Sequence, residues 1–170
     1  MEREIILNDF VHTFSTLEEV ISLFKEEDFN EVPFKDSWTP AQVAQHLILA
    51  NKNFAAILNG STKETNRAID HHIANLKSLF LNFEIKLKSP AFILPTNEYH
   101  SQPEQLDAIR QIKTDCIKAI EELDLSKTCL DFELPSFGFL TRFEAIYFVI
   151  YHTQRHIHQL KEIDKFLKSS

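Results

Sequence analysis

The segment "TRFEAIYFVIYHTQRHIHQL", residues 141–160, decides the fold because it predicts a long helix with a defined beginning. Thr141 followed by Glu144 is a capping box, in which each side chain bonds the backbone N–H of the other residue. The helical pattern continues to about Leu167. The part "FEAIYFVIY" is apolar around most of its circumference, as expected of a helix buried on two sides. One side is expected to face the core. The other faces either a second copy of the chain or the loops of a monomer.

Four other segments place apolar residues at the three-and-four spacing of an amphipathic helix. They cover Glu2 to about Glu27, Thr39 to about Asn59, about Asn66 to Lys88, and Glu104 to Leu123. The second of them begins with its own capping box, in which Thr39 and Gln42 flank Pro40 at the first helical position. Gly60 is expected to end that helix in a left-handed conformation.

Two segments interrupt the helical pattern. The first, "SPAFILPTNEYHSQP" at residues 89–103, contains three prolines and cannot remain helical. Because it also contains the apolar run Phe92, Ile93 and Leu94, we expect it to lie on the helices rather than project into water, and it could cover a pocket. The second, "DLSKTCLDFELPSFGFL" at residues 124–140, is interpreted as a linker.

The composition favours helices over sheets. The 170 residues include only two glycines and six prolines, so few tight turns are available for hairpins. No internal repeat or break in composition divides the chain. We therefore expect a single domain, residues 1–170, of the all-α class. Its predicted architecture is a four-helix bundle with an additional helical segment and a Pro-rich loop.

The charge distribution and the cysteines narrow the possible partners and location. A net charge of −7 without a cluster of basic residues argues against nucleic acid as a partner. No stretch has the length of a membrane span, and the first residues lack a leader pattern, so a cytoplasmic protein is expected. Cys116 falls in a predicted helix and Cys129 in a loop, and both are expected to be buried thiols rather than a disulfide or a zinc knuckle.

The last predicted helix contains a histidine pair at metal-binding spacing. His152 and His156 are four residues apart, so both side chains lie on one face and could hold one ion. His158 is turned by about 200° to another face. Gln159 shares the face of His156 and could orient a ligand or a water. Eight histidines in this chain predict roughly 0.4 such pairs by chance, so the alternative of hydrogen-bonded histidines with no other role stays open.

A third histidine strengthens the metal hypothesis. His46 lies in the second turn of the helix that begins at Thr39, beside its apolar stripe, and is therefore expected near the interior. Buried imidazoles need partners for their nitrogens, and His46, His152 and His156 could satisfy one another by sharing a divalent cation. Three neutral imidazoles with an open fourth position are the arrangement in which zinc activates water near neutral pH.

The sequence resembles the DinB/YfiT-like superfamily of four-helix-bundle metalloenzymes. The resemblance rests on "SWTPAQVAQHL" (37–47) and "YHTQRHIHQL" (151–160), with "SPAFILPTNEYHSQPEQL" and "FGFLTRFEAIYFVIYH" at the expected places between them. It implies that His46, His152 and His156 bind one divalent metal, usually nickel or zinc. It also implies a structural role for Trp38 and Pro40, and a homodimer.

Two further residues could take part in a site. His100, with its neighbours Glu98 and Tyr99, could line the pocket or assist proton transfer, or could belong to a solvated loop. Arg155 could bind an anionic group of a substrate or a surface carboxylate. The remaining histidines, which are His12, His71 and His72, lack a partner at helical spacing and are not expected to be ligands.

The resemblance implies two classes of enzyme. In the first, the metal binds a low-molecular-weight thiol as a cosubstrate for S-transfer, as in the bacillithiol and mycothiol enzymes of the superfamily. In the second, the same position binds water for hydrolysis of a small-molecule substrate. No carboxylate lies at helical spacing from the histidine pair on its face, so no general base is assigned. The alternative is a non-catalytic, stress-related dimeric scaffold protein with a structural or vestigial metal site.

Overall fold

The computed structural model describes residues 1–170, and the long last helix begins where the sequence predicts. Helix α7 covers Arg142–Lys168. The backbone N–H of Glu144 donates to Thr141 Oγ1 at 3.1 Å, and the backbone N–H of Thr141 donates to Glu144 Oε2 at 3.0 Å. The predicted capping box is therefore present, and it fixes the direction in which the chain enters the helix.

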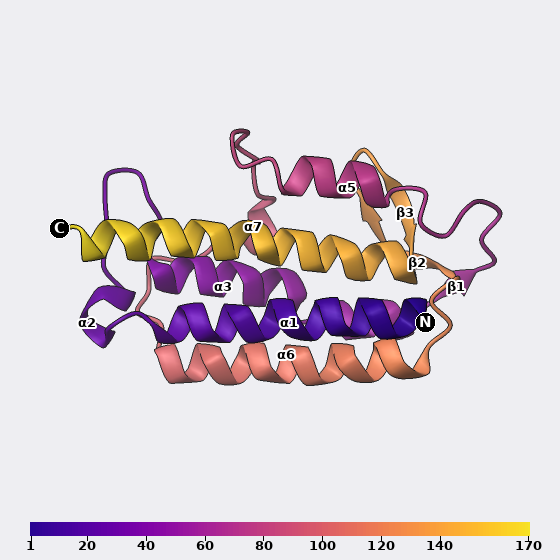
Figure 1. Ribbon diagram of the computed structural model, residues 1–170, viewed down its shortest axis with the longest axis horizontal. Helices are drawn as coiled ribbons and strands as arrows, with labels where there is room; N and C mark the ends of the chain where they lie inside the picture. Colours follow the sequence, from indigo (N-terminus) through magenta and orange to yellow (C-terminus); the bar gives the residue numbers. More distant parts are fainter.

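The protein is mostly helical. Its long helices are α1 (Glu2–Ser22), α3 (Pro40–Asn51), α6 (Gln102–Glu122) and α7, and its shorter ones are α2 (Glu26–Phe29), α4 (Phe54–Asn59), α5 (Ile73–Phe80) and the 3-10 helix η1 (Ala91–Ile93). Helix α1 packs against α6 and α7, and α3 packs against the same two helices. Figure 1 shows the four long helices side by side, with α5 lying along α7. A single core of 33 buried residues lies between them.

The first predicted helix ends earlier than expected because its last carbonyls have a tertiary partner. Helix α1 stops at Ser22, and α2 starts only at Glu26. The side-chain amide of Gln102, at the start of α6, donates to the carbonyls of Ile21 at 2.7 Å and Phe24 at 3.1 Å. These carbonyls are satisfied without a further helical turn, and the chain is free to bend.

The second predicted helix begins as expected but ends differently. Thr39 and Gln42 form the predicted capping box, while the helix divides into α3 and α4. Gly60 is not left-handed, since its φ is −78° and its ψ is −160°. Space favours glycine there, because a Cβ would lie 2.0 Å from Asp131 Oδ2 and 3.2 Å from the carbonyl oxygen of Ala56, and the Asp131 side chain would have to move. That oxygen accepts a hydrogen bond from the backbone N–H of Ser61 at 3.1 Å.

The helix predicted from Asn66 to Lys88 is much shorter in the structure, where α5 covers only Ile73–Phe80. Before it, the backbone N–H of His72 and the guanidinium of Arg67 bind the buried carboxylate of Glu144. After it, Arg155 binds backbone carbonyls of the departing chain. Tertiary contacts at both ends therefore override the helical pattern of the sequence.

The segment predicted to be a linker forms most of a small sheet. Strands β1 (Thr62–Lys63), β2 (Thr128–Leu134) and β3 (Gly138–Thr141) pair antiparallel in the order β1-β2-β3. The turn between β2 and β3 places Ser136 at φ 73° and Gly138 at φ 75°, so one glycine suffices for this hairpin. Cys129 consequently lies on a strand rather than in a loop. Both cysteines are buried and free, as predicted.

The Pro-rich segment lies partly on the helices. Its 3-10 helix η1 packs against α3. Phe92 is 77% exposed and Leu94 is 47% exposed, so most of the apolar run is not covered. Helix α6 then begins at Gln102, where Ser101 accepts a hydrogen bond from the backbone N–H of Glu104.

The apolar beginning of α7 is covered within one chain. Helices α1, α3 and α5 and strand β3 all pack against α7. Coverage by the chain itself therefore accounts for the apolar circumference, and a homodimer stays a prediction from the family resemblance.

No helix of the protein is both long enough and apolar enough to span a membrane.

Candidate metal centre

Three histidine side chains converge between α3 and α7. His46 comes from the second turn of α3, and His152 and His156 come from successive turns of α7. The Nε2 atom of His152 lies 3.1 Å from His46 Nε2 and 3.2 Å from His156 Nε2. The ligand atoms of all three residues lie within 4.8 Å of one another, so the group could hold a metal ion.

The outer nitrogens of two of these rings are held by hydrogen-bond acceptors. His46 Nδ1 lies 2.8 Å from the carbonyl oxygen of Ile93, and His156 Nδ1 lies 2.8 Å from Gln159 Oε1. Because both oxygens can only accept, each Nδ1 carries the proton and each Nε2 presents a lone pair to the centre. Gln159 thus lies where the sequence expected it, beside His156.

The three Nε2 atoms that face one another have too few protons to form hydrogen bonds at every contact. His152 Nε2 faces the Nε2 lone pairs of His46 and His156, and it carries at most one proton. One proton can bridge only one of the two contacts well. A cation bound by all three nitrogens satisfies every lone pair at once, which is the reason that such a cluster fits a metal.

Burial keeps the three imidazoles neutral. Their exposed fractions are 1% for His46, 8% for His152 and 9% for His156. Burial lowers the pKa of His46 below its usual value, against the opposing hydrogen bond to Ile93. Burial, together with repulsion from the other two histidines, lowers the pKa of His152 well below 6.5. Burial also lowers the pKa of His156 to about 3. Neutral imidazole is the form that binds metals, so no histidine has to lose a positive charge before it binds an ion at neutral pH.

The walls of the centre are aromatic. The ring centroid of Trp38 lies 5.2 Å from that of His46 and 6.5 Å from that of His156. Phe80 from α5 and Phe148 from α7 flank His152, with centroid distances of 5.9 and 5.8 Å. None of the hydrogen-bond partners of the three histidines is a carboxylate. Apolar walls exclude water and strengthen every electrostatic interaction inside the site.

The three imidazole nitrogens are a donor set typical of transition-metal sites. Two nitrogens bound tetrahedrally at 2.0–2.1 Å lie about 3.3 Å apart. The separations of His152 Nε2 from the other two Nε2 atoms, 3.1 and 3.2 Å, are close to this value, and all three ligand atoms lie within 4.8 Å of one another. Imidazole is a preferred ligand for zinc, nickel and copper, whereas magnesium and calcium prefer the oxygen ligands that are absent among these donors.

Two residues that were expected at the pocket make contacts with the backbone or side chains of the loops. The guanidinium of Arg155 donates to the carbonyls of Phe80, Asn82 and Ile85. The backbone of His100 exchanges two hydrogen bonds with the side chain of Asn30, and its ring contacts Thr96 at 3.3 Å. His100 is therefore not part of the histidine group.

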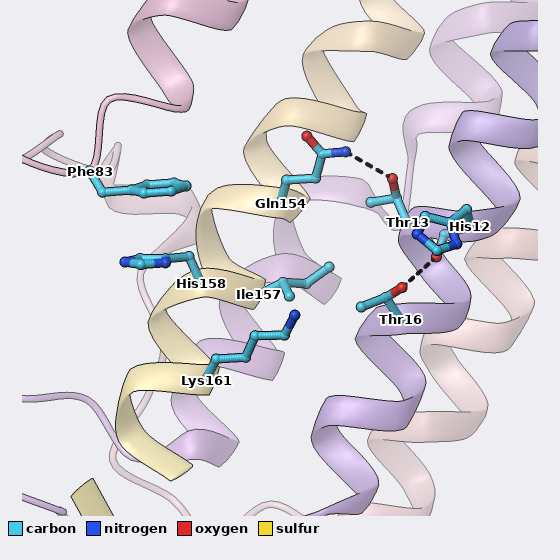
Figure 2. A pocket seen from close by; sticks show the side chains of 8 residues that line it. All are labelled: His12, Thr13, Thr16, Phe83, Gln154, Ile157, His158 and Lys161. Carbon is cyan, nitrogen blue, oxygen red and sulfur yellow. Dashed lines mark hydrogen bonds between the residues drawn. The ribbon is translucent and has the colours of Figure 1, made fainter. Parts of the chain in front are cut away.

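His158 faces away from the centre, as helical phase predicts. Its ring stacks on Phe83 with a centroid distance of 3.9 Å and an interplanar angle of 3°. Figure 2 shows this pair beside a separate hollow between α1 and α7, lined also by His12 and Lys161. The hollow measures about 270 Å³, and none of the three converging histidines lines it. His158 therefore provides a matched control for His156.

The comparisons with known proteins cover the same residues. A family model described as "DinB superfamily" matches residues 9–160, a range that includes all three histidines. An uncharacterized protein of Bacillus subtilis (strain 168), YuaE, is 25% identical over 142 residues, which are 81% of this chain and 84% of YuaE. No solved structure matches the chain.

Proposed function

The chain belongs to the DinB superfamily, and on that premise we propose that it is a divalent-metal-dependent enzyme whose ion is held by His46, His152 and His156. We also propose that its long helices form the four-helix bundle of that family. One observation carries the enzyme proposal. Three neutral, buried Nε2 atoms converge with at most one proton among them, and two of the rings are fixed from behind by Ile93 and Gln159.

The charge balance favours a thiolate as the fourth ligand. Three neutral imidazoles leave the charge of a divalent ion uncompensated in an aromatic site, and no carboxylate among their partners reduces it. An anionic ligand is therefore strongly favoured, and thiolate sulfur is a preferred ligand of zinc. The bound ion would lower the pKa of a coordinated thiol and keep it nucleophilic at neutral pH.

S-transfer from a low-molecular-weight thiol suits this site better than hydrolysis. None of the hydrogen-bond partners of the three histidines is a carboxylate that could act as a general base toward an attacking water. A thiol that has already lost its proton on binding needs no such base. Trp38, Phe80 and Phe148 would exclude bulk water from the reacting sulfur and offer an apolar surface to the carbon skeleton of an electrophilic small molecule.

The test uses the wild-type protein and two histidine variants. The proteins are loaded with cobalt(II), and a panel of low-molecular-weight thiols is added while the sulfur-to-cobalt charge-transfer absorption is recorded. Zinc-loaded and nickel-loaded proteins are then assayed for S-conjugation to a chlorodinitroarene. We expect the absorption band and thiol-dependent turnover in the wild type and in His158→Ala, and neither of them in His156→Ala.

Other results would point to the other functions. Ester or amide hydrolysis without thiol binding would favour the hydrolase. Stoichiometric metal with neither thiol binding nor turnover of any substrate would favour the non-catalytic scaffold protein. Thiol turnover that survives the loss of His156 would contradict the assignment of the site.

A further inference from the structure

The segment between α5 and α6 touches both helices that carry the histidines. We call residues 82–97 the strap. The first residues of the strap contact α7, and its last residues contact α3. In Figure 1 it leaves the end of α5 and passes α7 on its way to the start of α6. Each of its two attachments is made by the residue directly before one of the converging histidines.

The first attachment is Arg155, the neighbour of His156 on α7. Its guanidinium donates to the carbonyl oxygen of Phe80 at 3.2 Å and to that of Asn82 at 3.0 Å, and it also bonds the carbonyl of Ile85. A planar guanidinium can hold several carbonyls in a fixed geometry, which an ammonium group cannot do.

The second attachment is Gln45, the neighbour of His46 on α3. Its Oε1 atom accepts a hydrogen bond from the backbone N–H of Thr96 at 2.7 Å. Gln42, one turn earlier, adds a bond from Nε2 to the carbonyl of Thr96 at 3.2 Å and one to Asn97 Oδ1 at 3.1 Å. The end of the strap is thus tied to the helix that supplies the first histidine.

Between the two attachments the strap contributes the acceptor that orients His46. The Ile93 carbonyl lies three residues before Thr96 and accepts the Nδ1 proton of His46 at 2.8 Å. The apolar side chains beside it give little support, because Phe92 is 77% exposed and Leu94 is 47% exposed. The position of this carbonyl therefore depends on the polar attachments more than on the core.

We propose that Gln45 and Arg155 are positioning residues that hold the strap so that its Ile93 carbonyl keeps the proton of His46 on Nδ1 and its Nε2 directed at the centre. The metal-binding consequence rests on the proposed function, whereas the orientation of His46 does not. Groups that hold the outer nitrogen of a metal-binding histidine typically change metal affinity 10- to 100-fold. The proposal also explains why Arg155 bonds backbone carbonyls instead of an anion.

The direct test measures the tautomer of His46 in protein that has been stripped of metal. Imidazole nitrogen NMR distinguishes Nδ1–H from Nε2–H, and His46→Gln identifies the signal. We expect a single Nδ1–H tautomer in the wild type and a mixture of tautomers in Gln45→Met and Arg155→Lys. Met keeps the length of Gln but lacks its carbonyl oxygen. Lys keeps the positive charge of Arg but lacks the planar guanidinium that binds several carbonyls. Gln111→Met is the control, because Gln111 bonds only Asp115 on the surface of α6.

The second measurement is zinc affinity by competition with a chelating dye. We expect the dissociation constant to rise about tenfold in Gln45→Met and Arg155→Lys, and to stay unchanged in Gln111→Met. The charge of Arg155 disfavours a nearby cation, and the Lys variant preserves this effect. A weaker affinity in Arg155→Lys is therefore a result of lost positioning.

The outcomes separate the two proposals. If the wild type binds zinc while both variants keep the wild-type tautomer, the positioning role is overturned and the metal function stands, even if the variants melt at lower temperature. A wild-type His46 that is protonated on Nε2 also overturns the positioning role. If the wild type binds no metal but the variants show a mixture of His46 tautomers, the positioning role stands and the metal function fails.

Discussion

Helix α7 carries two buried polar groups that differ in how completely they are satisfied. At its beginning, Glu144 has a fully buried side chain, and its carboxylate accepts two bonds from Arg67 at 2.7 and 2.8 Å. The backbone N–H groups of His72 and Thr141 donate to it at 2.9 and 3.0 Å. Two turns later, the histidine centre has three inner nitrogens and at most one proton to share among them.

The difference indicates what each group is for. Every lone-pair direction of the Glu144 carboxylate has a donor from the chain itself, so this group fixes the fold and has no capacity for a ligand. The three imidazoles are equally well buried, but their lone pairs compete for one proton. A buried polar cluster that the protein completes is a structural element, and one that it leaves incomplete needs a bound ion or water to satisfy it, which is the role we propose for the metal ion here.

The largest expected effect is the loss of stability when the fully hydrogen-bonded group around Glu144 is broken. Replacing Glu144 with Ala leaves Arg67 and two backbone N–H groups without their acceptor, and we expect the free energy of unfolding to fall by about 3 kcal/mol or more. Urea denaturation of metal-free protein measures it. The control is Asp164→Asn, which breaks a surface ion pair with Lys168 on the same helix and should cost less than about 1 kcal/mol. Equal effects of the two changes would contradict a structural role for Glu144.

The next largest effect is the stabilisation of the folded protein by zinc bound at the three histidines. Zinc at 100 times its dissociation constant should raise the free energy of unfolding of the wild type by about 2.7 kcal/mol, because only the folded chain assembles the three histidines. His152→Leu should abolish this increase, and Asp164→Asn should retain it. Denaturation curves with and without zinc give the result. An equal zinc response in His152→Leu would mean that the ion binds elsewhere.

Acid should remove the contribution of Glu144. Burial raises the pKa of this carboxyl, but bonds from Arg67 and from the backbone N–H groups of Thr141 and His72 outweigh burial, so the pKa lies below 4.5 in the folded protein. A lowered folded pKa means that the stabilisation is complete above pH 4.5 and is lost as the pH falls through the folded value. The stability difference between wild type and Glu144→Ala should therefore shrink below pH 4.5. A difference that stays constant down to pH 3 would contradict this account.

The smallest expected effect is the loss of one histidine in the absence of metal. His152 packs against Phe80 and Phe148, and its inner nitrogen takes part in contacts that one proton cannot satisfy. Replacing it with Leu in metal-free protein should change the free energy of unfolding by less than about 1 kcal/mol in either direction. A destabilisation as large as that of Glu144→Ala would show that the histidine cluster is itself a structural element.

The sequence predicted the parts of the fold that depend on local patterns. The capping boxes at Thr39 and Thr141 and the apolar spacing of the long helices involve only residues within a few positions of one another. The end of α1 depends on Gln102, and the space at Gly60 is limited by Asp131, each distant in sequence. Such tertiary partners leave no periodic signal, and the small sheet was missed because strand β2 does not alternate cleanly between buried and exposed residues.

The same distinction applies to the site. Helical phase placed His152 and His156 on one face and removed His158, and the apolar stripe of the second helix with the family resemblance added His46. The Ile93 carbonyl could not have been predicted, because a backbone acceptor on an irregular segment has no residue type that marks it. The partners of Arg155 could not be predicted for the same reason: the sequence suggested an anionic group of a substrate or a surface carboxylate, whereas the structure shows backbone carbonyls.

The most direct test of the central claim is the metal content of three proteins. The wild type, His156→Ala and His158→Ala are incubated with zinc or nickel, passed through a desalting column and analysed for metal per chain. The account predicts one tightly bound ion in the wild type and in His158→Ala, and none in His156→Ala. A wild type that retains no ion, or a His156→Ala protein that retains as much as the wild type, would contradict it.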